Sequence, residues 1–140
     1  MRKVLFVCTG NTCRSPMAAA VANHMFKNRA MPFAAASCGV FAHVGAAASA
    51  HALAVMAGHG LDISGHAAGV VDEDEVAAAC VIITMTQSHK NRLLSLFPHF
   101  ADKVHTMDID DPFGGPLALY EDCAAQIKKY IEAFGWEDFV

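Results

Sequence analysis

Residues 3–16 read Lys3-Val4-Leu5-Phe6-Val7-Cys8-Thr9-Gly10-Asn11-Thr12-Cys13-Arg14-Ser15-Pro16. The first six form a short apolar run rich in Val and Phe, which is typical of a strand buried on both faces. Ser15-Pro16 predicts a helix start, with Ser15 as the N-cap and Pro16 as the first helical residue. A six-residue loop, 9–14, therefore joins a buried strand to a helix.

The rest of the chain repeats this alternation of strands and helices. Further strands are predicted at 32–37, 80–85 and 103–106, and helices are predicted after Ser49, over 72–79 and after Thr86. A last helix presents apolar residues on one face, namely Tyr120, Cys123, Ala124, Ile127, Ile131 and Phe134. This order predicts an α/β fold: a single domain over 1–140 with an open four-stranded parallel sheet and helices on both faces.

Composition excludes several classes of protein. The chain has 140 residues, of which 54% are apolar and 17% charged, so a disordered tail is excluded. The net charge of −4 and the lack of any Lys/Arg block argue against nucleic acid or an anionic membrane as a partner. The apolar run near the amino terminus is too short for a signal peptide, which predicts a cytoplasmic protein. Eight scattered histidines without ligand spacing predict no metal, and we expect no cofactor.

The loop after the first strand has the features of an anion site. Ligands of open α/β sheets bind beyond the carboxyl ends of the strands, and N–H groups that lead into a helix converge on anions. Gly10 and Asn11 tolerate the left-handed backbone that such a loop requires. Arg14 adds a planar group that can hold two phosphate oxygens.

Cys8 lies at the base of this loop. Cationic surroundings are expected to lower the pKa of its thiol below the usual ~8.5. The Ser15 hydroxyl could then hydrogen-bond the thiolate when it acts as a leaving group. This arrangement predicts nucleophilic catalysis through a cysteinyl-phosphate.

The segment from Val7 to Pro16 resembles the signature loop of low-molecular-weight protein tyrosine phosphatases, and the resemblance spans nearly the whole chain. Three further segments are similar to motifs of that family. They are Ser37-Cys38-Gly39, Asp62-Ile63-Ser64-Gly65-His66 and Asp111-Pro112-Phe113-Gly114-Gly115.

The resemblance implies roles for individual residues. Cys8 would be the nucleophile, Arg14 the phosphate clamp and Asp111 the general acid and base. Spacing alone leaves Asp108, Asp110 and Asp111 open, and the motif selects Asp111. Phosphate-loop positions would be Thr9, Gly10, Asn11, Thr12, Cys13 and Ser15, with Ser37 and His66 as supports and Phe113 at the substrate entrance. The implied partners are phosphorylated proteins, with phosphate or another oxyanion in the loop.

The resemblance also implies features that separate branches of the family. Cys13 would form a reversible disulfide that shields Cys8 from over-oxidation. Phosphotyrosine is the expected substrate. However, Thr12 and Phe113 match the branch that acts on phosphoarginine, which is the main alternative.

Two other functions are alternatives. Arsenate reduction on the same fold needs two further, closely spaced cysteines, and Cys80 has no such neighbour. A non-catalytic phosphopeptide-binding module would be favoured by loss of Cys8, Arg14 or Asp111, and all three are present.

Overall fold

The computed structural model describes all 140 residues and has the predicted strands and helices in the predicted order. The strands are β1 (Arg2–Cys8), β2 (Phe33–Gly39), β3 (Ala79–Thr84) and β4 (Val104–Thr106). The helices are α1 (Arg14–Asn28), α2 (Ala50–Gly58), α3 (Glu73–Ala78), α4 (Gln87–Leu96) and α5 (Leu117–Ala133). Two short 3₁₀ helices, η1 (Pro98–Lys103) and η2 (Trp136–Phe139), were not predicted.

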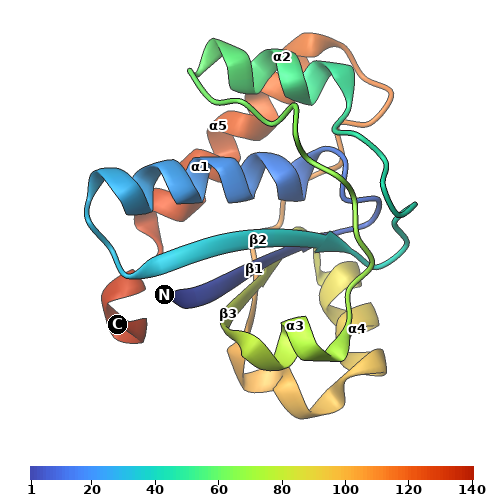
Figure 1. Ribbon diagram of the computed structural model, residues 1–140. Helices are drawn as coiled ribbons and strands as arrows, with labels where there is room; N and C mark the ends of the chain where they lie inside the picture. Colours follow the sequence, from blue (N-terminus) through green and yellow to red (C-terminus); the bar gives the residue numbers. More distant parts are fainter.

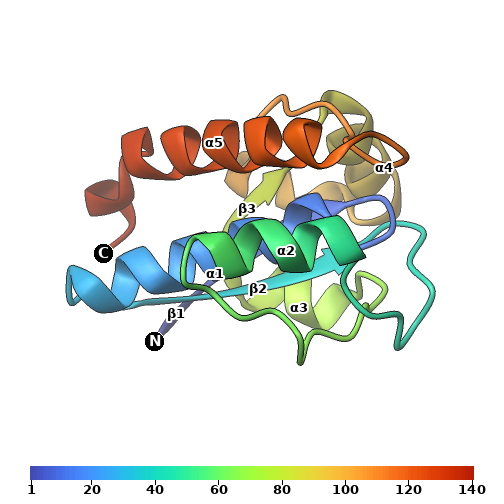
Figure 2. The same cartoon turned by 90° about the horizontal axis from the view of Figure 1, so that it is seen from above.

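The four strands form one parallel sheet in the order β2-β1-β3-β4. Helices α1, α2 and α5 lie on one side of it, and α3 and α4 lie on the other (Figure 1). Seen from above, α1, α2 and α5 form a layer over the sheet (Figure 2). The α/β fold class with helices on both faces is therefore confirmed.

Side chains along β1 point alternately to the two faces of the sheet, and both faces are buried. Val4 and Phe6 pack in a core with α1, α2 and α5, whereas Leu5 and Val7 pack in a second core with α3 and α4. All four side chains are completely buried. Because successive side chains of a strand point to opposite faces, a strand between two helical layers needs a continuous apolar run.

Hydrogen bonds near the helix starts confirm that helices follow Ser49 and Thr86, and they make Asp72, predicted as the first residue of a helix over 72–79, the N-cap of α3 instead. Ser49, Asp72 and Thr86 each accept the N–H of the residue three positions later, which starts α2, α3 and α4. The predicted N-cap at Ser15 is wrong, because α1 begins at Arg14 and its N-cap is Cys13. The Ser15 hydroxyl hydrogen-bonds with Cys8 and Asn11 instead.

None of the helices combines the length and the apolar character that crossing a bilayer requires.

Candidate active site

A pocket of about 270 Å³ opens at the carboxyl end of β1. It is lined by Cys8, Thr9, Gly10, Thr12, Cys13, Arg14, His43, Ala46, Asp111 and Phe113. Seven of these residues come from the loop predicted to bind an anion or from the segment predicted to carry the acid. The loop and the acid-bearing segment, about 100 residues apart in the sequence, therefore meet at one pocket.

Asn11 holds the phosphate loop from within. It is completely buried, and its backbone has a left-handed φ of 57°. Its side-chain amide donates to the hydroxyls of Ser15 and Ser37 at 2.8 and 2.9 Å, and its side-chain oxygen accepts from the Gly69 N–H at 3.0 Å. His66 Nε2 lies 2.6 Å from the Asn11 carbonyl oxygen and hydrogen-bonds with it. The two predicted supports, Ser37 and His66, thus both contact this residue.

A second contact fixes the loop against β2. A side chain on Gly39 would place its Cβ 2.4 Å from the Thr9 carbonyl oxygen, so only glycine allows this approach. That oxygen accepts the N–H of Phe41, and the Cys8 carbonyl accepts the N–H of Val40. The loop is therefore fixed by backbone contacts as well as by Asn11.

The nucleophile candidate, Cys8, is buried beneath the loop. Its Sγ lies 2.8 Å from the Ser15 hydroxyl and accepts the Asn11 N–H at 3.3 Å. Because the Ser15 oxygen already accepts from the Asn11 amide, its own proton is available to Cys8. These bonds favour the thiolate.

The predicted lowering of the Cys8 pKa is wrong for this arrangement. Burial raises the pKa of the thiol, and this effect outweighs the hydrogen bonds from Ser15 and Asn11 and the charge of Arg14. The Arg14 guanidinium donates to the Ile109 carbonyl at 2.8 Å and lies 3.7 Å from the Asp111 carboxylate. Its charge is thus shared with the opposite wall of the pocket.

Among the three neighbouring aspartates, only Asp111 lines the pocket. Its carboxylate is half exposed and accepts the Phe113 N–H at 3.0 Å, which orients it beside Arg14. Asp108 has a left-handed φ of 65°, and Asp108 and Asp110 are both exposed. The geometry thus agrees with the choice that the motif suggested.

Cys13, in the same loop, is also buried. It donates to Ser49 Oγ at 3.3 Å, and its Sγ lies 3.6 Å from the Tyr120 hydroxyl. Thr12 lines the pocket, and its carbonyl accepts the Ser49 N–H at 2.9 Å. These bonds connect the loop to α2 and α5.

Sequence reasoning did not find two features of the site. His43 and Ala46, from the segment between β2 and α2, also line the pocket. His89, from α4, lies 2.7 Å from the Thr9 hydroxyl. No local pattern marks these residues, since only the crossing of distant segments places them here.

Comparisons with known proteins agree with this geometry. Residues 3–137 match the family described as low molecular weight phosphotyrosine protein phosphatase. A protein-arginine-phosphatase of Geobacillus stearothermophilus is 36% identical over 93% of this chain and 91% of its own length. The low molecular weight protein-tyrosine-phosphatase PtpB of Staphylococcus epidermidis is 33% identical over 93% of this chain and 94% of its own.

A crystal structure of a low molecular weight protein tyrosine phosphatase from T. tengcongensis superposes with a TM-score of 0.91. It is 40% identical, and the match covers 94% of this chain and 96% of that one. On the family match and these relatives together, the chain belongs to the low molecular weight phosphotyrosine protein phosphatases.

Proposed function

We propose that this protein removes phosphoryl groups from protein side chains through a cysteinyl-phosphate on Cys8. One observation carries the proposal: Cys8, Arg14 and Asp111 line a single pocket whose loop is held by buried hydrogen bonds. A nucleophile, an anion clamp and a carboxyl group are the three components that this chemistry requires.

In the first step the Cys8 thiolate attacks phosphorus, and the bond from phosphorus to the leaving group breaks. The loop N–H groups and Arg14 hold the non-bridging oxygens, whose charge they neutralise. Asp111, protonated at this stage, gives its proton to the departing atom. The product is the free side chain and a phosphoryl group on sulfur.

In the second step water attacks the phosphoryl group, and Asp111, now a carboxylate, takes a proton from that water. The sulfur–phosphorus bond breaks, inorganic phosphate leaves, and Cys8 returns as a thiolate. The Ser15 proton stabilises the sulfur as it departs, since the hydroxyl lies 2.8 Å from it. Asn11, Ser37 and His66 serve by keeping the loop in shape.

Phosphotyrosine is the substrate expected from the family. Phe113 is 76% exposed at the pocket mouth, where it is free to stack on a phenyl ring.

Phosphoarginine is the second candidate, and the placing of Thr12 favours it. Thr12 and Phe113 line the same pocket, which offers a hydroxyl and an aromatic ring to a substrate side chain. A guanidinium can donate to the hydroxyl and stack on the ring. An aliphatic residue at position 12 would offer a phenyl ring a better wall.

The activity is tested with Cys8→Ser, because an alcohol in this position lacks the acidity of a thiol. We expect the variant to melt like the wild type and to lose turnover of p-nitrophenyl phosphate. Near wild-type turnover would remove Cys8 from its role.

The substrate is tested by comparing kcat/KM on phosphotyrosine and phosphoarginine peptides. Under the second candidate, Thr12→Ile lowers the phosphoarginine value relative to the phosphotyrosine value. Equal changes in both would mean that Thr12 shapes the loop without selecting the substrate. No phosphoarginine activity in the wild type would leave the phosphotyrosine proposal standing alone.

The cysteines argue against arsenate reduction. Cys38 lies within β2 and Cys80 within β3, so neither is on a segment free to relay a disulfide. Location in the cytoplasm stays a prediction from the sequence.

A further inference from the structure

His89 is a buried histidine that the proposed chemistry does not use. It lies in the first turn of α4, on the side of the sheet opposite to α1, and is only 6% exposed. Both of its ring nitrogens are within hydrogen-bond distance of a threonine hydroxyl. Nδ1 lies 3.0 Å from Thr86 Oγ1, and Nε2 lies 2.7 Å from Thr9 Oγ1.

The cap of α4 favours the tautomer of His89 that carries its proton on Nε2. Thr86 Oγ1 accepts the backbone N–H of His89, so its own proton is available for Nδ1. Nδ1 is then the acceptor, and in a neutral ring the proton resides on Nε2. His89 is neutral at ordinary pH because burial and the charge of Arg14 lower its pKa to about 4, against the opposing effect of Asp111.

The orientation of His89 determines the direction of the Thr9 hydroxyl. With the proton on Nε2, the 2.7 Å contact makes His89 the donor and Thr9 Oγ1 the acceptor. The Thr9 proton is thereby directed away from His89. Thr9 lines the pocket beside Cys8 and Arg14, so this proton is presented to an occupant of the pocket.

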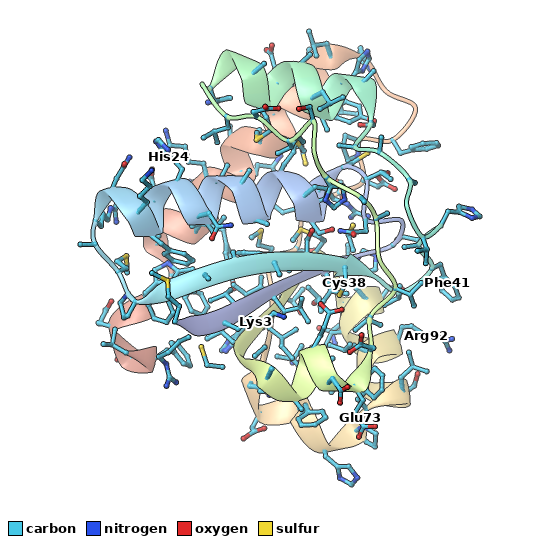
Figure 3. The ribbon with its side chains drawn as sticks, viewed as in Figure 1. Lys3, His24, Cys38, Phe41, Glu73 and Arg92 are labelled. Atoms are coloured by element: carbon cyan, nitrogen blue, oxygen red, sulfur yellow. The ribbon has the colours of Figure 1, made fainter.

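Neighbouring contacts keep α4 in place for this task. Arg92, one turn beyond His89, lies over the Phe41 ring, 5.0 Å from its centroid (Figure 3). The Phe41 N–H in turn donates to the Thr9 carbonyl. Thr9 is therefore held through its backbone by the segment after β2 and through its side chain by α4.

We propose that His89 is a positioning residue that makes the Thr9 hydroxyl an obligate donor to a phosphoryl oxygen in the pocket. The chain of donors runs from Thr86 to His89 to Thr9 and then to the bound anion. This inference rests on the proposed phosphatase function for its substrate. The geometry of the donor chain itself does not depend on turnover.

Two substitutions of His89 distinguish a role in orienting the Thr9 hydroxyl from a role in packing alone. Glutamine places its amide N–H near the position of Nε2, whereas asparagine reaches only the position of Nδ1. We expect His89→Asn to lower kcat/KM for p-nitrophenyl phosphate and the affinity for inorganic phosphate by about tenfold each, the value of one hydrogen bond to a charged group. His89→Gln should stay within about threefold of the wild type by the same estimate. His24→Asn, on the exposed face of α1 (Figure 3), is the matched control and should change neither.

A double-mutant cycle tests whether His89 acts through Thr9. Thr9→Val keeps the shape of the side chain and removes its hydroxyl, and it should lose as much phosphate affinity as His89→Asn. The double variant should then be no worse than either single variant. Additive losses would overturn the proposal, as would His89→Asn with wild-type affinity or His89→Gln as impaired as His89→Asn.

Nitrogen-15 NMR of the His89 ring provides a readout independent of activity. The proposal requires the proton on Nε2 at pH 7, and a proton on Nδ1 would overturn it. If the wild type binds inorganic phosphate but hydrolyses no phosphomonoester or phosphoarginine, the proposed function fails. The phosphate affinities of the variants would still decide the role of His89.

Discussion

Replacing Asn11 by alanine tests whether the phosphate loop depends on one buried amide. The substitution removes three side-chain hydrogen bonds, to Ser15, Ser37 and the Gly69 N–H. Each such bond contributes about 1 kcal/mol to stability, and its loss costs more where it leaves a buried donor or acceptor without a hydrogen bond. Alanine also bears the left-handed φ of 57° less well than asparagine, which adds about 1 kcal/mol. The expected loss is about 4 kcal/mol of unfolding free energy.

Urea denaturation followed by circular dichroism measures this loss, and the melting temperature should fall by roughly 10–15 °C. Asn11→Gly loses the same bonds without the backbone penalty, so it should be the more stable of the two by up to about 1 kcal/mol. The matched control is Asn23→Ala. Asn23 also bonds the backbone, through the N–H and carbonyl of Ala35, but it is exposed, so about 1 kcal/mol or less is expected. If Asn11→Ala cost no more than Asn23→Ala, the loop would not depend on this amide.

Three further predictions concern chemistry and pH. Asp111→Asn should lower kcat for substrates with poor leaving groups by about 10²–10⁴-fold. Asp110→Asn, in the same loop, should lower kcat much less, and the reverse order would refute the assignment. Brief peroxide treatment should inactivate the enzyme through a Cys8–Cys13 disulfide that thiols reverse, and mass spectrometry showing sulfinic acid on Cys8 with free Cys13 would exclude the protective pair. The pKa of His89 is about 4 in the folded protein against 6.5 ordinarily, so the unfolded chain binds the extra proton between these values. Stability should therefore fall by about 3 kcal/mol as pH drops from 6.5 to 4, and His89→Gln should remove that slope in denaturation curves.

Local signals explain why most of the fold could be predicted from the sequence. The caps at Ser49, Asp72 and Thr86 are bonds across three residues, so the pattern that forms them is contained in the chain segment itself. The buried strands are continuous apolar runs, as expected for a sheet that is covered by helices on both faces. The predicted N-cap at Ser15 failed because the Ser15 hydroxyl hydrogen-bonds with the Cys8 sulfur, seven residues earlier, instead of with the first turn of α1.

Only the site residues that belong to recognisable family motifs could be predicted from the sequence. Cys8, Arg14 and Asp111 line one pocket, as the resemblance implied, but their roles stay predictions until measured. The direction of the Cys8 pKa was missed because burial is a tertiary property that a loop sequence does not reveal. His89 was missed because Thr9 and His89 are 80 residues apart and neither belongs to a recognisable pair.

Two chains of hydrogen bonds reach the pocket, and both consist of neutral donors. One runs from Asn11 through Ser15 to the Cys8 sulfur, and the other runs from Thr86 through His89 to Thr9. Neutral donors hold a loop without competing for the anion, and Arg14 is the only arginine or lysine among the residues that line the pocket. Its charge is partly shared with Asp111 at 3.7 Å, whose half-exposed carboxylate is open to screening by salt, whereas Arg14 itself is buried. Added salt should thus weaken the attraction of a dianionic substrate while leaving the buried loop geometry intact, because the bonds that define the loop involve no exposed ions.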